Sequence, residues 1–204
     1  MDEVSRSMKK FLMGLFLALS PIGIMGQVYH AGEESPETSS VRWEVSIAWV
    51  QPNQHVQGQL GETLFRRKGG PSVRGLYYPT AWMGVGVEGF KSDWQDFPIS
   101  NSYKAVRYGL VSKWLLTPQT MPSAYVLLGA GQMRQRTSYS DTVYFTARPA
   151  YGLVGLGLET RVYRGWFVAA EGQAVYYEHS RIDEFVRLEH RWELAFLVRG
   201  GIRF

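Results

Sequence analysis

Cysteine is absent from the 204-residue sequence. Without a thiol, the chain cannot form a disulfide scaffold, a thiolate metal site, a thiol nucleophile or an N-terminal lipid-modified cysteine. An excess of one charge is also lacking: 22 lysines and arginines stand against 18 aspartates and glutamates, and the basic residues are scattered. A nucleic-acid-binding protein would show a basic patch or stripe, so we predict no nucleic-acid partner.

Metal-ligand spacing is missing as well. The sequence holds four histidines, and each is isolated from other ligand types at the spacing that a metal site requires: His30, His55, His179 and His190. We therefore predict no metal and no cofactor.

No run reaches the roughly 20 apolar residues that a membrane-spanning helix needs. The most apolar segment begins at Met8 and reads MKKFLMGLFLALSPIGIMGQ, with two lysines, an apolar core, a Ser-Pro break and the small residue Gly26. This layout is typical of a secretory signal peptide. We expect a signal peptide over residues 1–26 with Met8 as the start, a flexible polar lead-in over 27–40, and one folded domain over 41–204.

Helical periodicity is absent from residue 41 onward, and apolar and polar residues alternate with a period of two. That period is typical of β-strands. The segment VRWEVSIAWV, for example, places Trp43, Val45 and Ile47 on one face and Glu44 on the other. The predicted fold class is all-β, with eight strands in residues 41–50, 72–78, 81–90, 105–116, 123–135, 150–161, 165–177 and 193–204.

The connections between these strands alternate between short turns and long polar loops. The long loops cover residues 51–71, 91–103, 135–148 and 178–192. An even number of strands with short turns at one rim and long loops at the other is the arrangement of a bacterial transmembrane barrel. We therefore predict an eight-stranded antiparallel up-and-down β-barrel with four extracellular loops.

The face that points into the barrel distinguishes a membrane barrel from a secreted lipocalin-like carrier. A lipocalin-like carrier would bury its apolar face and expose its charged face to water. Several glycines share the charged face, including Gly84, Gly109 and Gly157. Glycine is costly in a strand and of little use on a solvated surface, whereas a narrow lumen needs empty positions beside long side chains. We infer that the charged face points inward and the apolar face toward lipid.

The inward face should then hold a packed network of charges and not a wide pore, because buried charges persist when paired. Barrel closure should place Glu44 beside Arg203 or Arg199, with Glu171 a neighbour of Arg199. The predicted network comprises Glu44, Glu88, Arg107, Lys113, Glu159, Arg161, Glu171, Arg199 and Arg203.

The signal peptide, the eight strands, the alternating loops and the final segment ELAFLVRGGIRF resemble the small outer-membrane β-barrels of the OmpA, OmpX and opacity-protein type. The resemblance implies the bacterial outer membrane, contact with its lipid and lipopolysaccharide, and a non-enzymatic envelope or surface-interaction role. In that family the last strand is the signal for the barrel-assembly machinery, which would fall on Ile202 and Phe204. The glycine usual five residues before the terminal aromatic is replaced here by Arg199.

A lipid A-modifying barrel hydrolase is the alternative. The segment YYEHSRIDEFVRLEH holds His179 and Ser180, the weak candidates for catalysis. In the lipid A deacylase family the histidine and serine lie two residues apart on one strand face. Adjacent residues point to opposite faces of a strand, so we predict no catalytic site here.

Overall fold

The computed structural model describes residues 43–53, 55–58, 63–66, 68–95, 102–139, 143–179, 181 and 186–204. The signal peptide and lead-in expected over residues 1–40 lie outside this part of the chain. Eight strands form the barrel: β1 (Trp43–Pro52), β4 (Gly70–Tyr77), β5 (Met83–Gln95), β6 (Ser102–Leu115), β7 (Ser123–Tyr139), β9 (Ala150–Tyr163), β10 (Trp166–Tyr177) and β12 (Trp192–Arg203). Their order is β6-β5-β4-β1-β12-β10-β9-β7, and the pairing of β6 with β7 closes the cylinder. The predicted all-β, eight-stranded antiparallel barrel is confirmed.

The first and last barrel strands meet beside the C-terminus. The backbone N–H of Trp43 donates to the Phe204 carbonyl, and the N–H of Phe204 donates to the Trp43 carbonyl, both at 3.0 Å. The register of β1 and β12 places Glu44 opposite Arg203. Closure leaves no unpaired strand edge in the spanning part of the barrel, as a lipid environment requires.

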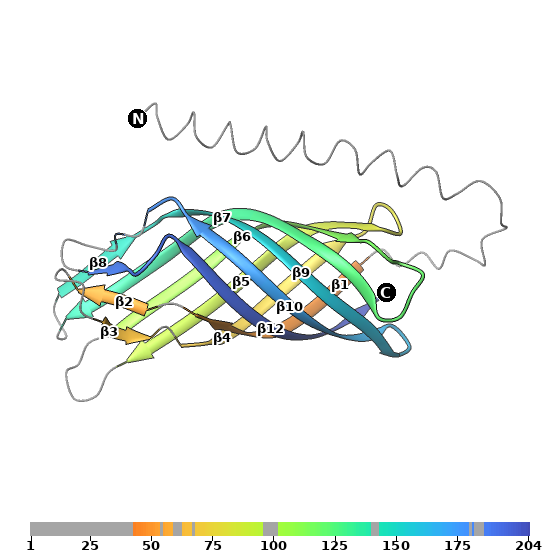
Figure 1. Ribbon diagram of the computed structural model, residues 1–204, viewed down its shortest axis with the longest axis horizontal. Coiled ribbons are helices and arrows are strands. Elements are labelled where there is room, and N and C mark those ends of the chain that lie inside the picture. The colour runs from red at the N-terminus through yellow and green to blue at the C-terminus, as the bar shows by residue number, and fades with distance from the viewer. Residues whose placement is uncertain are drawn as a thin grey trace, which may run out of the picture. The chain divides into compact units, whose positions relative to one another are not determined.

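A second sheet stands where the sequence predicted only loops. It consists of β2 (His55–Gly58), β3 (Thr63–Arg66) and β11 (Val186–Leu188), in the order β11-β2-β3. A further strand, β8 (Val143–Ala147), pairs with the end of β7. Strands of three to five residues show too few alternations to be recognised by periodicity, so these segments were predicted as long polar loops. Figure 1 shows β2, β3 and β8 at the end of the barrel opposite the C-terminus.

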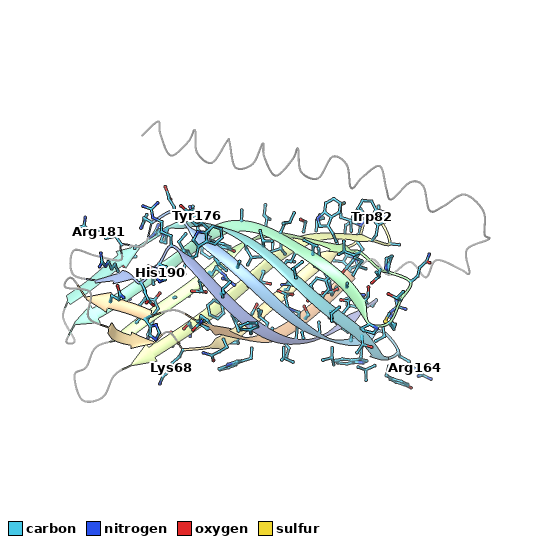
Figure 2. All side chains as sticks on the ribbon, viewed as in Figure 1. Lys68, Trp82, Arg164, Tyr176, Arg181 and His190 are labelled. Atoms are coloured by element: carbon cyan, nitrogen blue, oxygen red, sulfur yellow. The ribbon has the colours of Figure 1, made fainter. Side chains whose placement is uncertain are left out.

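The two ends of the barrel therefore differ. In Figure 2, Trp82 and Arg164 lie at the end formed by short turns, and Lys68, Arg181 and His190 lie at the other end. We call these the turn end and the loop end. Leu188 of β11 is fully buried and belongs to the same apolar cluster as Tyr103, Met133 and Tyr177, so the second sheet helps to cover the loop end of the lumen.

The outward face of the barrel is apolar. Along β1 exposed and buried residues alternate at every position, and the outward side chains of Leu110 and Phe196 are 71% and 68% exposed. Aromatic pairs mark both margins of this apolar belt: Trp43 with Tyr77 and Trp82 with Trp114 toward the turn end, and Tyr176 with Trp192 toward the loop end. Among the described residues, no helix is long and apolar enough to cross a membrane. An apolar wall between aromatic margins is the surface of a transmembrane barrel, and the lipocalin-like carrier is excluded.

An arginine in the middle of the belt tests this orientation. Leu156 is outward-facing and lies opposite Gly172, midway along β10 between Trp166 and Tyr176. In lipid vesicles we expect Leu156→Arg to lower the free energy of unfolding by about 2–4 kcal/mol, the cost of arginine at the bilayer midplane. Urea titration followed by tryptophan fluorescence measures the change, with Leu156→Ala as the control for lost side-chain contacts. Equal stability of Leu156→Arg and Leu156→Ala would contradict a lipid-facing wall.

Candidate functional site: the charge network of the lumen

The turn-side cluster consists of Glu44, Tyr78, Lys113, Glu159 and Arg203. Lys113 Nζ lies 2.5 Å from Glu159 Oε2 and 3.1 Å from Glu44 Oε2. Arg203 Nη2 lies 2.6 Å from Glu159 Oε1 and 2.8 Å from Glu44 Oε2. The Tyr78 hydroxyl donates to Glu44 Oε2 at 2.6 Å. Each cation contacts both carboxylates, which offsets the desolvation of four buried charges.

The loop-side cluster is built around Arg74. Its Nη2 lies 2.6 Å from Glu88 Oε2 and 2.7 Å from Glu171 Oε1, and its side chain is fully buried. Arg199 reaches the same Glu88 oxygen from β12 with a distance of 3.1 Å from Nη2. One guanidinium thus holds a carboxylate of the neighbouring strand and one from across the lumen. Glu88 on β5 lies directly opposite Arg74 on β4, whereas Glu171 comes from β10.

Arg107 extends this cluster toward the loop end. Its Nη2 donates to Gln173 Oε1 at 2.9 Å, and the Gln173 amide donates to Glu171 Oε1 at 2.6 Å. Arg107 also lies 3.7 Å from Glu88 and 3.9 Å from Glu193. The cluster therefore contains three guanidinium groups and three carboxylates, and its formal charge is zero.

Aromatic rings join the two clusters, and glycines make room for the rings. The Tyr125 hydroxyl donates to Glu171 Oε2 at 2.7 Å, while Lys113 Nζ lies 4.5 Å from the centroid of the same ring. A Cβ at Gly157 would collide with the Tyr125 ring, and a Cβ at Gly201 would lie 2.7 Å from Phe167. The glycines of the inner face thus accommodate rings that cover the cations, in addition to leaving space for charged side chains.

Of the nine charged residues predicted for the lumen, eight lie in these clusters: Glu44, Glu88, Arg107, Lys113, Glu159, Glu171, Arg199 and Arg203. Glu44 contacts Arg203, and Arg199 Nε lies 3.9 Å from Glu171 Oε2. The prediction that Arg161 belongs to the lumen network is wrong, because its side chain is exposed. The alternation of β9 stops at Glu159, and the residues from 160 to 163 are all exposed beside a register irregularity in the hairpin.

The sequence reasoning missed the central residue, Arg74. Its segment, SVRGLYY, has apolar residues on both faces, with Val73 exposed and Leu76 buried, so its orientation was unclear. The available signal was the single charge in an otherwise uncharged strand, flanked by the small inward-facing Ser72. The buried hydroxyl groups of Tyr78 and Tyr125 were also missed, and Gln173 and Glu193 were left out of the predicted charge network although they stand on the charged faces of their strands.

The weak catalytic candidates do not form a site among the described residues. His179 Nδ1 lies 3.0 Å from the Arg181 carbonyl oxygen, and Ser180 lies outside the residues that the structure describes. In the same part of the chain, no group of three or more histidines and acidic residues could hold a metal ion.

Comparison with known proteins places the fold. The sequence matches no protein-family model, and a search of curated proteins found no significant relative. Neisserial surface protein A matches the structure with a TM-score of 0.60 and 11% identity, covering 79% of this chain and 97% of that one. Ail, the attachment invasion locus protein of Yersinia pestis, matches with a TM-score of 0.55 and 18% identity, covering 81% and 99%. At these identities the likeness is one of fold: the chain has the fold of the small outer-membrane β-barrels.

Truncation of Arg74 tests how much the ion pairs of the lumen contribute to the stability of the barrel. Arg74→Ala leaves two buried carboxylates without their shortest ion pairs, and we expect it to lower the free energy of unfolding by about 3–5 kcal/mol. Arg161→Ala removes the same residue type at an exposed position and should change the stability by less than about 0.5 kcal/mol. Urea unfolding of both variants in one detergent gives the comparison. Two equal midpoints would contradict the assignment.

Proposed function

We propose that this outer-membrane β-barrel is a non-enzymatic protein without a wide pore that stabilises the envelope and presents its loop end as an interaction surface. The observation that carries the proposal is the filled lumen. Two clusters of formal charge zero occupy it, and Tyr125 links them across the barrel. Charged groups engaged in this way contribute to packing, and they do not line a water-filled path.

The loop end supplies the surface. The sheet formed by β2, β3 and β11, together with β8, extends the barrel at this end (Figure 1). Surface loops held by a rigid scaffold are the usual site of recognition. The apolar belt below them contacts outer-membrane lipid, and lipopolysaccharide is the lipid expected beside an outward-facing loop end.

Solute uptake into vesicles tests the closed lumen. Liposomes containing the folded chain from Gln27 onward should swell in a small sugar no faster than protein-free liposomes. A variant with serine in place of Arg74, Glu88, Glu171 and Arg199 serves as the positive control, because it removes the side chains that fill the middle of the lumen. Its folding is checked by heat-modifiable gel mobility. Swelling by the unmodified protein at the rate of this variant would overturn the proposal.

We also propose that the last strand directs assembly of the barrel, with Ile202 and Phe204 as the recognised side chains. The Phe204 side chain is 64% exposed on the outer wall, and its backbone completes the closure with Trp43. A partner that binds the edge of β12 before this strand pairs with β1 could contact both side chains. The family resemblance supports the barrel-assembly machinery as that partner.

Phe204→Ala separates recognition from closure, because it keeps both backbone hydrogen bonds to Trp43. We expect a large loss of surface-exposed protein in cells, measured by protease accessibility, with little change in the urea midpoint of the refolded protein. The stability effect is bounded at about 1.5–3 kcal/mol even for a fully buried side chain. Val198→Ala, equally outward on β12 and 67% exposed, is the control. Normal surface levels of Phe204→Ala would rule out the recognition role.

A further inference from the structure

The hairpin that joins β9 to β10 extends past the start of β7 at the turn end. The pairing of β9 with β7 ends where Glu159 lies opposite Ser123. The pairing of β9 with β10 continues further, to Tyr163 opposite Trp166. We call residues 160–166 the turn-end hairpin. Among the described residues, no strand pairs with β9 on the β7 side of this hairpin.

The free edge of the turn-end hairpin presents the backbone of Arg161. Along an antiparallel strand, the N–H and C=O groups of alternate residues face opposite neighbours. The Pro149 carbonyl accepts from Met133 N, so the odd-numbered residues of β9 face β7, and Glu159 is the last of them to lie opposite a residue of that strand. The register of β9 against β10 is regular as far as Arg161, which lies opposite Phe167. Arg161 therefore directs its N–H and C=O toward the side on which β7 is missing.

The sequence of the hairpin favours an extended edge. Thr160, Val162 and Tyr163 are β-branched or aromatic, which are the residue types preferred in strands. Val162 has no residue opposite it on β10 and forms a bulge, and bulges at the rims of barrels change the direction of side chains. The Val162 and Tyr163 side chains are 65% and 61% exposed. An exposed edge of strand-forming residues is a template for pairing with another chain.

The exposed charged side chains of the turn end are both positive in the part of the chain that the structure describes. Arg161 and Arg164 are exposed, and neither guanidinium contacts a carboxylate of a described residue. The turns over residues 78–82 and 116–122 contain no charged residue. Glu159, the acidic residue nearest to the hairpin, is buried in the turn-side cluster. The hairpin thus offers two unneutralised guanidinium groups beside its free edge.

Arg164 occupies a costly backbone position at the tip of the hairpin, which Figure 2 places at the turn end. Its φ is 34°, and Gly165 follows with a φ of 87°. Two successive positive φ angles define a tight turn that favours Asn-Gly or Asp-Gly. Residues held in such rare conformations cluster at functional sites. An arginine kept where asparagine would fit more easily is consistent with a use for its charge.

We propose that the turn-end hairpin binds an extended acidic segment of a periplasmic protein by strand addition at Arg161. The inference rests on the proposed function, because a loop end that faces outward places the turn end in the periplasm. Main-chain hydrogen bonds supply the pairing, and carboxylates on one face of the added strand meet the two guanidinium groups. A lipid head group would answer the charge alone, since it has no peptide backbone to pair with the edge.

NMR spectroscopy of the folded chain from Gln27 onward in neutral detergent, titrated with a short peptide in which glutamate alternates with valine or threonine, tests the site. The alternation places every glutamate on one face of the added strand. We expect saturable shifts of the backbone amide signals of Arg161 and its neighbours. Arg161→Gln combined with Arg164→Gln should weaken binding about tenfold, because each of two exposed ion pairs contributes a few-fold.

The matched control variant, Lys68→Gln combined with Arg187→Gln, removes two exposed cations at the loop end. It should bind the peptide within about twofold of the unmodified protein, because distant sites act independently. Heat-modifiable gel mobility confirms that each variant is folded. Equal losses in the two double variants would overturn the proposal, since the peptide would then respond to the total charge of the protein.

Altered peptides separate strand pairing from charge. Only every second N–H of an added strand faces the hairpin, so N-methylation of one set of alternate amides should abolish the shifts at Arg161, and N-methylation of the other set should not. Glutamine in place of every glutamate should weaken binding at least as much as the hairpin variant. Equal binding of the two N-methylated peptides, full binding of the glutamine peptide, or displacement of the peptide by phosphatidylglycerol would each overturn the proposal.

The outcome can be told apart from that of the proposed function. A lack of peptide binding in a protein that does not swell liposomes would leave the proposed function standing. Sugar uptake by a protein that binds the peptide selectively would overturn the proposed function alone.

Discussion

A charge buried in the narrow interior of an eight-stranded barrel must meet an opposite charge, and the rest of this structure follows from that constraint. The desolvation of one unpaired ion costs several kcal/mol. Only every second residue of a β-strand points inward, so few positions can supply the opposite charge. The barrel meets the constraint by pairing ions across strands that are distant in sequence. Arg74, from β4, holds Glu171, from β10, with a distance of 2.7 Å. The small inward residues, the rings over Lys113 and the apolar outer wall are all consistent with a charged interior that is fully packed.

Most strands of the barrel could be predicted from the sequence, because apolar and polar residues alternate regularly where one face of the sheet contacts lipid. β1 alternates at every residue, and its inward Glu44 and outward Trp43 were recognised from the pattern alone. Prediction failed where the alternation carries no such signal. Arg74 lies on a strand with apolar residues on both faces, and Arg161 lies beyond Glu159, where the burial alternation of β9 stops although its pairing with β10 continues. The strands β2 and β11 pair over a long separation, which no local pattern contains.

The three surfaces of the barrel carry different chemistry. The lumen holds acidic and basic groups that pair with one another. The outer wall is apolar over most of its height, between aromatic margins. The loop end adds a small sheet whose Leu188 is inserted into the interior. The side chains that remain accessible to a partner lie on the outer wall and at the two ends of the barrel, and the proposed interaction surfaces are the loop end and the turn-end hairpin.

The contact between Glu44 and Arg203 joins residues separated by 159 positions in the chain. Glu44 of the turn-side cluster gains Arg203 as a partner only when β1 and β12 have met. A sheet that has not closed would present half-neutralised ions together with an open strand edge, and lipid accommodates neither. The charges of the lumen thus favour the closed cylinder over an open sheet, because Glu44 on the first barrel strand is neutralised by Arg203 on the last.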